Sequence, residues 1–153
     1  MLAVRGRLDN RQAIVEIGVQ RFDLSFNQVE PHQIAPVMPI ASYRALIDTG
    51  AQRTCLTHRT IAQEGLSRHG KLFIKNVHNE NVHSLFLVKL GFWASNETLG
   101  YQNTERSYFG LPGATEVINI ADNERFDAII GMDVLQFFDV RFSKTGEFSI
   151  NLS

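Results

Sequence analysis

The most informative stretch of this sequence is Leu46-Ile47-Asp48-Thr49-Gly50-Ala51. Apolar residues lead into an acid, a hydroxyl and a glycine, a pattern typical of a buried strand that ends in a tight turn. Because glycine has no Cβ, Gly50 lets a ligand or a second chain approach the backbone closely. An acid that directly follows an apolar run is poorly solvated, and such acids are rarely buried unless a partner or a reaction uses them.

A second stretch, Phe126 to Leu135, contains Ile129-Ile130-Gly131, two apolar residues and a glycine that open a short helix. Three residues such as Asp-Thr-Gly are a weak signal alone, because short motifs recur by chance. The two stretches together, with Thr54 and Leu56 between them, resemble the aspartic proteases of the retroviral type, the retropepsins. The resemblance runs from about Ala13 to the C-terminus. A separation of about 80 residues fits one domain of ordinary size.

The resemblance implies a mainly β fold: a retropepsin-like closed β-barrel, the acid protease fold, with one or two short helices and one lobe per chain. Residues 1–153 would form a single domain with its core at about 13–153. A loop elaboration is expected at 22–41, where Pro31, Pro36 and Pro39 exclude a central strand. A flap hairpin is expected at about 74–85, although its tip lacks the glycines that are usual in the family.

The resemblance also implies an aspartic endopeptidase with Asp48 as the catalytic acid. This chemistry needs two carboxylates around one water, and the two share a single proton. The chain has one Asp-Thr/Ser-Gly, so the second acid must come from a second copy of the chain in a homodimer. By the same resemblance Thr49 would brace the paired turns and Gly50 would lie along the polypeptide substrate. The expected substrate-binding residues are Ala51, Gln52, Arg53, Val77, His78 and Asn79.

Two alternatives stay open at this stage. The first is a dimerisation or peptide-binding module on the same fold with little or no turnover, because a fold alone never establishes activity. The second is a zymogen-like state in which the segment from Met1 to Gln12 blocks the cleft. For the dimer interface, the terminal segment Phe148–Leu152 is the expected strand, since an open strand edge seeks a partner.

Composition bounds the partners of the chain. It has 153 residues, 44% apolar, and a net charge of −1 with both signs interspersed. This balance gives no electrostatic footprint for nucleic acid or an anionic membrane. No run approaches the roughly 20 apolar residues that span a bilayer, and Met1 to Arg7 lacks the apolar run of a secretory signal. With one cysteine there is no intrachain disulfide, so we expect a soluble, cytoplasmic protein without metal or cofactor.

Periodicity and turn residues place the elements. Thr57 is the expected cap of a short helix from His58 to Glu64, and a second helix is expected at Met132 to Phe138. Ser95 to Gly113 is polar and is expected to be a long loop. The expected strands, from alternating or continuous apolar residues, are Ala13–Val19, Phe22–Phe26, Ser42–Ile47, Leu72–Val77, Val82–Phe92, Thr115–Ile120, Phe126–Ile130, Asp139–Phe142 and Glu147–Leu152.

Other polar residues receive plainer interpretations. Cys55 and His58 could form half of a zinc site, but the other half is missing from the sequence. As a nucleophile, the thiol lacks an orienting partner. Cys55 is therefore expected to pack in the core. His78 and His83 are expected to lie in a solvated loop. Asp133 falls in the first turn of a helix, where the helix dipole favours a negative charge, so a structural role is expected. Asp127 is assigned no role.

Overall fold

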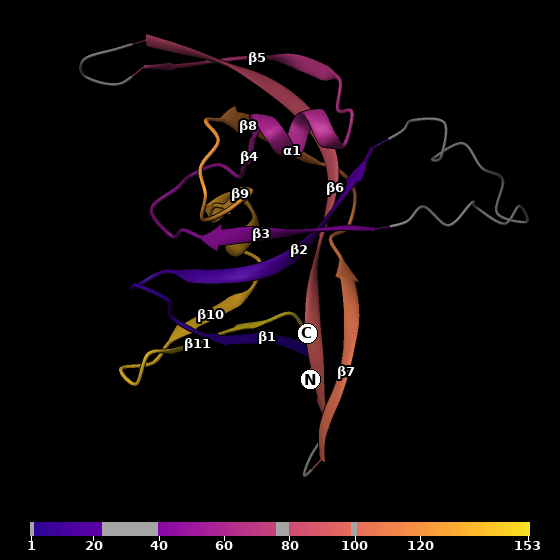
Figure 1. Ribbon diagram of the computed structural model, residues 1–153, viewed down its shortest axis with the longest axis vertical. Coiled ribbons are helices and arrows are strands. Elements are labelled where there is room, and N and C mark those ends of the chain that lie inside the picture. The colour runs from indigo at the N-terminus through magenta and orange to yellow at the C-terminus, as the bar shows by residue number, and fades with distance from the viewer. Residues whose placement is uncertain (1, 23–39, 76–79, 99–100) are drawn as a thin grey trace, which may run out of the picture.

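The computed structural model describes residues 2–22, 40–75, 80–98 and 101–153 (Figure 1). Within them the chain is mainly β with two short helices, which confirms the predicted fold class. The elements in order are β1 Leu2–Arg7, β2 Ala13–Arg21, β3 Ala41–Ile47, β4 Cys55–Thr57, α1 His58–Gln63, β5 Arg68–Lys75, β6 Glu80–Thr98, β7 Tyr101–Gly110, β8 Thr115–Ile120, β9 Ala128–Ile130, α2 Met132–Leu135, β10 Asp139–Phe142 and β11 Glu147–Asn151.

Six of the strands close into a barrel. Their pairing runs β6–β2–β3–β9–β4–β8, and β8 returns to β6 through the register Leu85↔Ile118 to Val88↔Thr115. The pairs β3–β9 and β4–β8 are parallel and the other pairs of the ring are antiparallel. Closure leaves these six strands without an open edge in the ring.

Alternating side chains fill the barrel. In β2, Ala13, Val15, Ile17 and Val19 are buried, as the period-2 pattern of the sequence predicts. They meet buried side chains of the other barrel strands, and the largest of those with almost no exposure are Leu56, Val88, Phe92, Val117 and Ile130. The core therefore lies directly beneath the strand that leads into Asp48.

A three-stranded layer, β10–β11–β1, adjoins the barrel through the pairing of β1 with β6 (Figure 1). The β10–β11 turn ends at Gly146, whose φ of 87° favours glycine, so the hairpin predicted here is confirmed. The expectation that Phe148–Leu152 offers an open edge is wrong, because β11 pairs with β1 on one side and β10 on the other. The first residues are strand β1 rather than a free segment.

The long loop predicted from Ser95 to Gly113 is wrong. Strand β6 continues to Thr98 and β7 pairs with it antiparallel. Aromatic contacts override the polar composition, because the rings of Trp93 and Tyr108 lie 5.0 Å apart and Arg106 lies 4.9 Å over the Trp93 ring.

The predicted hairpin before this point is confirmed in its two strands, β5 and β6, which pair from Lys75↔Glu80 toward Gly70↔Leu85. The tip at 76–79 and the proline-containing segment 23–39, with the strand expected at Phe22–Phe26, lie outside the described residues. The prediction of a solvated loop at His83 is wrong. His83 is half-buried in β6, and its Nδ1 lies 3.1 Å from the carbonyl oxygen of Asn119 in β8.

Both predicted helices are present. Thr57 caps α1 by accepting a hydrogen bond from the Thr60 N–H, as expected. Helix α2 is one turn, shorter than the predicted Met132–Phe138, and the chain continues past it in turns. Neither described helix has the length and apolar character needed to span a bilayer.

Candidate active site

The candidate site is the turn that follows β3. The Asp48 N–H donates to the Ile130 carbonyl at the end of β9 (3.0 Å). The parallel β3–β9 pair therefore fixes the position of the Asp48 backbone. The Gly50 N–H donates to Asp48 Oδ1 at 2.9 Å, and the Ala51 N–H donates to the Asp48 carbonyl at 3.2 Å. These bonds orient one carboxylate oxygen. Within the described residues, the other has no hydrogen-bond partner.

The surroundings of the carboxylate are open on one side. Asp48 is half-buried, whereas Thr49 and Gly50 are exposed. The Thr49 hydroxyl has no hydrogen bond in the described part of the chain. The turn therefore presents an acid, a hydroxyl and a bare backbone on the molecular surface, all of them able to meet a ligand or another chain.

Helix α2 supports this turn from behind. The Met132 N–H donates to the Ala51 carbonyl at 2.8 Å, and the Asp133 N–H donates to the Gln52 carbonyl at 3.2 Å. The two amides at the start of α2 thus bind the two carbonyls that follow the Asp48 turn. The acid is presented by a braced turn, not by a free loop.

Asp133 is engaged in the same support. Its carboxylate accepts hydrogen bonds from the Thr54 N–H (3.0 Å) and the Thr54 hydroxyl (2.7 Å), and that hydroxyl in turn accepts from the Gly131 N–H (3.2 Å). The structural role expected for Asp133 matches these contacts. Its carboxylate joins the chain after Asp48 to the start of α2.

Arg53 and Glu116 border the site on the α2 side. Their side chains are 40% and 41% exposed and form an ion pair at 3.3 Å. Beyond them lies a cavity of about 800 Å³. Its walls are mostly apolar and aromatic, and they consist of Gln52, Arg53, Phe109, Leu111, Pro112, Ala114, Thr115, Glu116, Asp133, Val134, Phe137 and Phe138.

Of the predicted site residues, Asp48 to Arg53 share the single braced turn. Val77, His78 and Asn79 lie outside the described residues, so the structure does not place them against Asp48. The β5–β6 hairpin and the chain just after β3 extend toward the same side of the barrel, at the left of Figure 1.

Cys55 lies beneath the turn and is buried. Its thiol donates to the Arg53 carbonyl oxygen at 3.4 Å. Burial, and then the charges of Asp133 and Asp48, raises the pKa of the thiol to about 11. At neutral pH this group is a protonated packing cysteine. In the described part of the chain, no three His, Cys, Asp or Glu side chains gather where they could hold a metal ion.

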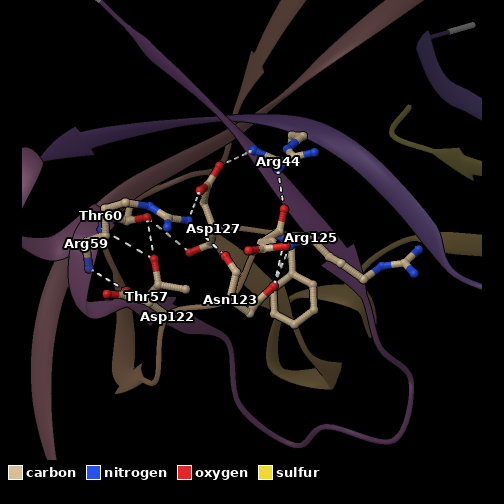
Figure 2. Close-up of polar contacts among 10 residues, drawn as sticks. Arg44, Thr57, Arg59, Thr60, Asp122, Asn123, Arg125 and Asp127 are labelled. Atoms are coloured by element: carbon tan, nitrogen blue, oxygen red, sulfur yellow. Dashed lines mark hydrogen bonds and ion pairs between the residues drawn. The ribbon is translucent and has the colours of Figure 1, made fainter.

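Asp127, which was given no role, is the centre of a polar network behind the site (Figure 2). Its carboxylate accepts from the Arg44 N–H at 3.0 Å and from the Arg59 guanidinium at 2.9 Å. Its carbonyl accepts from the Thr57 N–H at 2.9 Å and from the Thr60 hydroxyl at 3.2 Å. These contacts join three parts of the fold: β3, which leads into Asp48, the cap of α1, and the residue that precedes β9.

Comparison with known proteins adds two similar solved structures. The first is a retropepsin-like aspartic protease from Rickettsia conorii, with 13% identity, a TM-score of 0.46, and coverage of 97% of this chain and 92% of that one. The second is the retroviral protease-like domain of Ddi1 from Leishmania major, with 16% identity, a TM-score of 0.39, and coverage of 86% and 82%. At these values the superposition is loose, so the site rests on the residues of the chain itself.

No protein-family model matches the sequence. No curated protein matches it either.

Proposed function

We propose that this protein is an aspartic endopeptidase that works as a homodimer, with Asp48 and the partner's Asp48 as its catalytic dyad. In such a dyad one carboxylate is ionised and accepts a proton from the attacking water. The other is neutral and donates to the carbonyl of the scissile bond. Two adjacent acids cannot both ionise, so the pair titrates as a unit.

The observation that carries the proposal is the presentation of Asp48. Its carboxylate stands on an exposed turn with one oxygen held by the Gly50 N–H at 2.9 Å. A catalytic acid must be held in a fixed orientation, and backbone amides together with packed neighbours provide this. Asp127 and Asp133 do not compete for this role, because both carboxylates are already bonded within the fold.

The substrate in this proposal is a polypeptide in an extended conformation. Gln52 and Arg53 follow the catalytic turn and border the cavity beside it, so they would contact substrate residues away from the scissile bond. Val77, His78 and Asn79 would close over the same substrate from the hairpin. A single free, buried cysteine is compatible with a reducing compartment, so we place this activity in the cytoplasm.

The test is the change Asp48→Asn, which keeps the shape of the side chain and removes its charge and its ability to share a proton. Cleavage of a mixed peptide library should fall to background, while the circular dichroism spectrum and the dimer dissociation constant stay unchanged. The matched control is Asp9→Asn, an acid whose side chain is 85% exposed in the turn between β1 and β2, and it should keep full activity. Cleavage that survives in pure Asp48→Asn protein would rule out the proposal.

A peptide-binding or dimerisation module without turnover is the second candidate. It is favoured by one fact: in the described residues, a single chain offers one available carboxylate at the turn. It predicts that peptides bind the wild-type protein and the Asp48→Asn variant equally and leave both intact. Mass spectrometry of the library after incubation decides between the two candidates.

A further inference from the structure

The cavity beside Arg53 is a concave site separate from the catalytic turn. Among the described residues that line it, Asp48, Thr49 and Gly50 are absent. Its volume of about 800 Å³ lies within the range of pockets that enclose small organic ligands, about 300–1,000 Å³. No single amino-acid side chain would fill a space of this size. The cavity therefore fits a small molecule better than one residue of a polypeptide.

Aromatic and aliphatic side chains form most of the cavity wall, and the fold holds them in place. The Phe138 ring packs edge-on against the rings of Phe92 and Phe109, with centroids 6.0 Å apart in both pairs. Leu111 is fixed as well, since its N–H donates to the Leu90 carbonyl at 2.8 Å. These walls are formed without a ligand, which lowers the entropy cost of binding one.

Three apolar residues of the wall are exposed to water: Pro112 and Ala114 in the turn between β7 and β8, and Phe137 just after α2. Phe137 is 75% exposed. A ligand in the cavity would cover part of this apolar surface. Each Å² removed from water favours binding by about 25 cal/mol.

The polar part of the wall offers hydrogen-bond donors. The carboxylate of Asp133 already accepts from Thr54. Arg53 donates through Nη1 to Glu116 at 3.3 Å. The other N–H groups of Arg53, and the side-chain amide of Gln52, have no acceptor in the described part of the chain. A ligand that reaches this part of the cavity is therefore met by free donors.

The ion pair disfavours a charged ligand of either sign. A carboxylate that binds Arg53 would lie beside Glu116, and an ammonium that binds Glu116 would lie beside Arg53, because the two side chains are 3.3 Å apart. Like charges at this range are costly where the surroundings are mostly apolar. A neutral carbonyl or amide oxygen accepts from Arg53 without either repulsion.

We propose that this cavity binds a neutral, mainly apolar small molecule that carries a carbonyl or amide oxygen. The oxygen accepts hydrogen bonds from Arg53 and Gln52. The apolar body lies against Phe109, Leu111 and Phe137. The site is not part of the catalytic turn, so it stands whether or not the protein cleaves peptides.

Occupancy of the cavity acts on the support of the catalytic turn, because Gln52 and Asp133 belong to both. The Asp133 N–H donates to the Gln52 carbonyl at 3.2 Å. A ligand that packs against both residues holds this bond closed. Hydrogen exchange of the Asp133 amide should slow about 10-fold at a ligand concentration about ten times the dissociation constant. Unchanged exchange in the saturated protein would refute this coupling.

Filling the cavity tests its position. The probe is Nile red, a neutral dye with a ring carbonyl whose fluorescence rises in apolar surroundings. It should bind the wild-type protein with one dye per chain. Ala114→Phe places a ring at the cavity from an exposed position and should weaken binding about 10-fold or more. The matched control is Ala62→Phe on exposed α1, outside the lining, which should bind as wild type.

Circular dichroism checks that both variants are folded. Failure of the dye to bind wild type, or equal binding by Ala114→Phe and Ala62→Phe, would overturn the proposed site.

Three competitors with the same decyl chain test the head group: decanamide, decanoate and decylammonium. Decanamide should displace Nile red from wild type at the lowest concentration. Glu116→Gln should improve displacement by decanoate about 10-fold, because it leaves Arg53 unpaired, and Arg53→Gln should do the same for decylammonium. A charged competitor that is strongest on wild type, or one unchanged order in all three proteins, would refute the assigned chemistry.

A peptide occupant gives a different result. Displacement of the dye by a mixed peptide library, but by none of the three decyl compounds, would assign the cavity to a polypeptide and overturn the proposal.

Discussion

Gly131 lies so close to the backbone of Arg53 that a Cβ at position 131 would stand 2.8 Å from both the carbonyl carbon and the carbonyl oxygen of Arg53. The Ala51 carbonyl oxygen would be 2.9 Å away. This contact is where the two sequence stretches, Leu46–Ala51 and Phe126–Leu135, meet in space. The glycine is required because backbone, which cannot move aside like a flexible side chain, fills the position.

We therefore predict that Gly131→Ala lowers the free energy of unfolding by about 1–3 kcal/mol, the usual range for overpacking. The displaced turn should also reduce any activity of Asp48. Urea denaturation measures the first effect. Gly110→Ala is the control, because its nearest neighbour would be Tyr108 Cε1 at an ordinary 3.8 Å. Equal stability of the two variants would show that the contact with Arg53 is not constraining.

Asp127→Ala should lower the free energy of unfolding by about 1–3 kcal/mol, since it leaves the Arg44 N–H without its acceptor and removes the carboxylate paired with the Arg59 guanidinium. The Asp127 side chain is only 18% exposed, so water replaces the carboxylate poorly. Asp127→Asn keeps one acceptor oxygen and should lose less. Asp9→Ala, which breaks only a 3.9 Å surface pair with Arg125, should change stability by about 0.5 kcal/mol or less.

We predict a loss of stability at alkaline pH that is due to Cys55. Burial raises the pKa of its thiol from 9.0 to about 11, so the unfolded chain loses this proton at a lower pH than the folded chain. Its contribution to stability is present below pH 9 and is lost as the pH rises through 11. Between pH 9 and pH 11 the free energy of unfolding should fall more steeply with pH for wild type than for Cys55→Ala. Parallel curves would contradict this assignment. The native thiol should also react slowly with alkylating reagents at pH 8.

Arg53 and Glu116 allow substrate contact to be separated from stability. Arg53→Gln and Glu116→Gln remove the same half-exposed ion pair, so each should change the free energy of unfolding by at most about 1 kcal/mol. If Arg53 contacts the bound polypeptide, as the proposed function requires, only Arg53→Gln should raise KM. Steady-state kinetics on one peptide measures this difference. Equal KM values in the two variants would assign Arg53 to the ion pair alone.

Much of this fold was accessible from sequence because local signals and tertiary packing agree. Strands β2, β3 and β8 follow their apolar patterns, and the turns at Gly65 and Gly146 carry the positive φ that glycine supplies. Asp48 to Arg53 could be gathered into one site for a simpler reason, since they are consecutive.

The features of the fold and the site that the sequence could not predict depend on contacts between distant residues. Strand β7 was expected to be a loop, because its polar composition gives no hint of the Trp93–Tyr108 contact. The role of Asp127 requires Arg44 and Arg59, which are far away in the chain, to converge on it. The position of β11 between β1 and β10 depends on where the N-terminal strand packs, and no local pattern encodes that. A useful signal was available for Asp127: an acid at the start of an apolar strand requires partners.

The proposed dyad can be tested by the distance between the two Asp48 carboxylates in a crystal structure of the protein. We expect a two-fold dimer with the carboxylate oxygens about 3 Å apart, close enough to share one proton. A monomer, or a dimer whose Asp48 side chains face different surfaces, would contradict it.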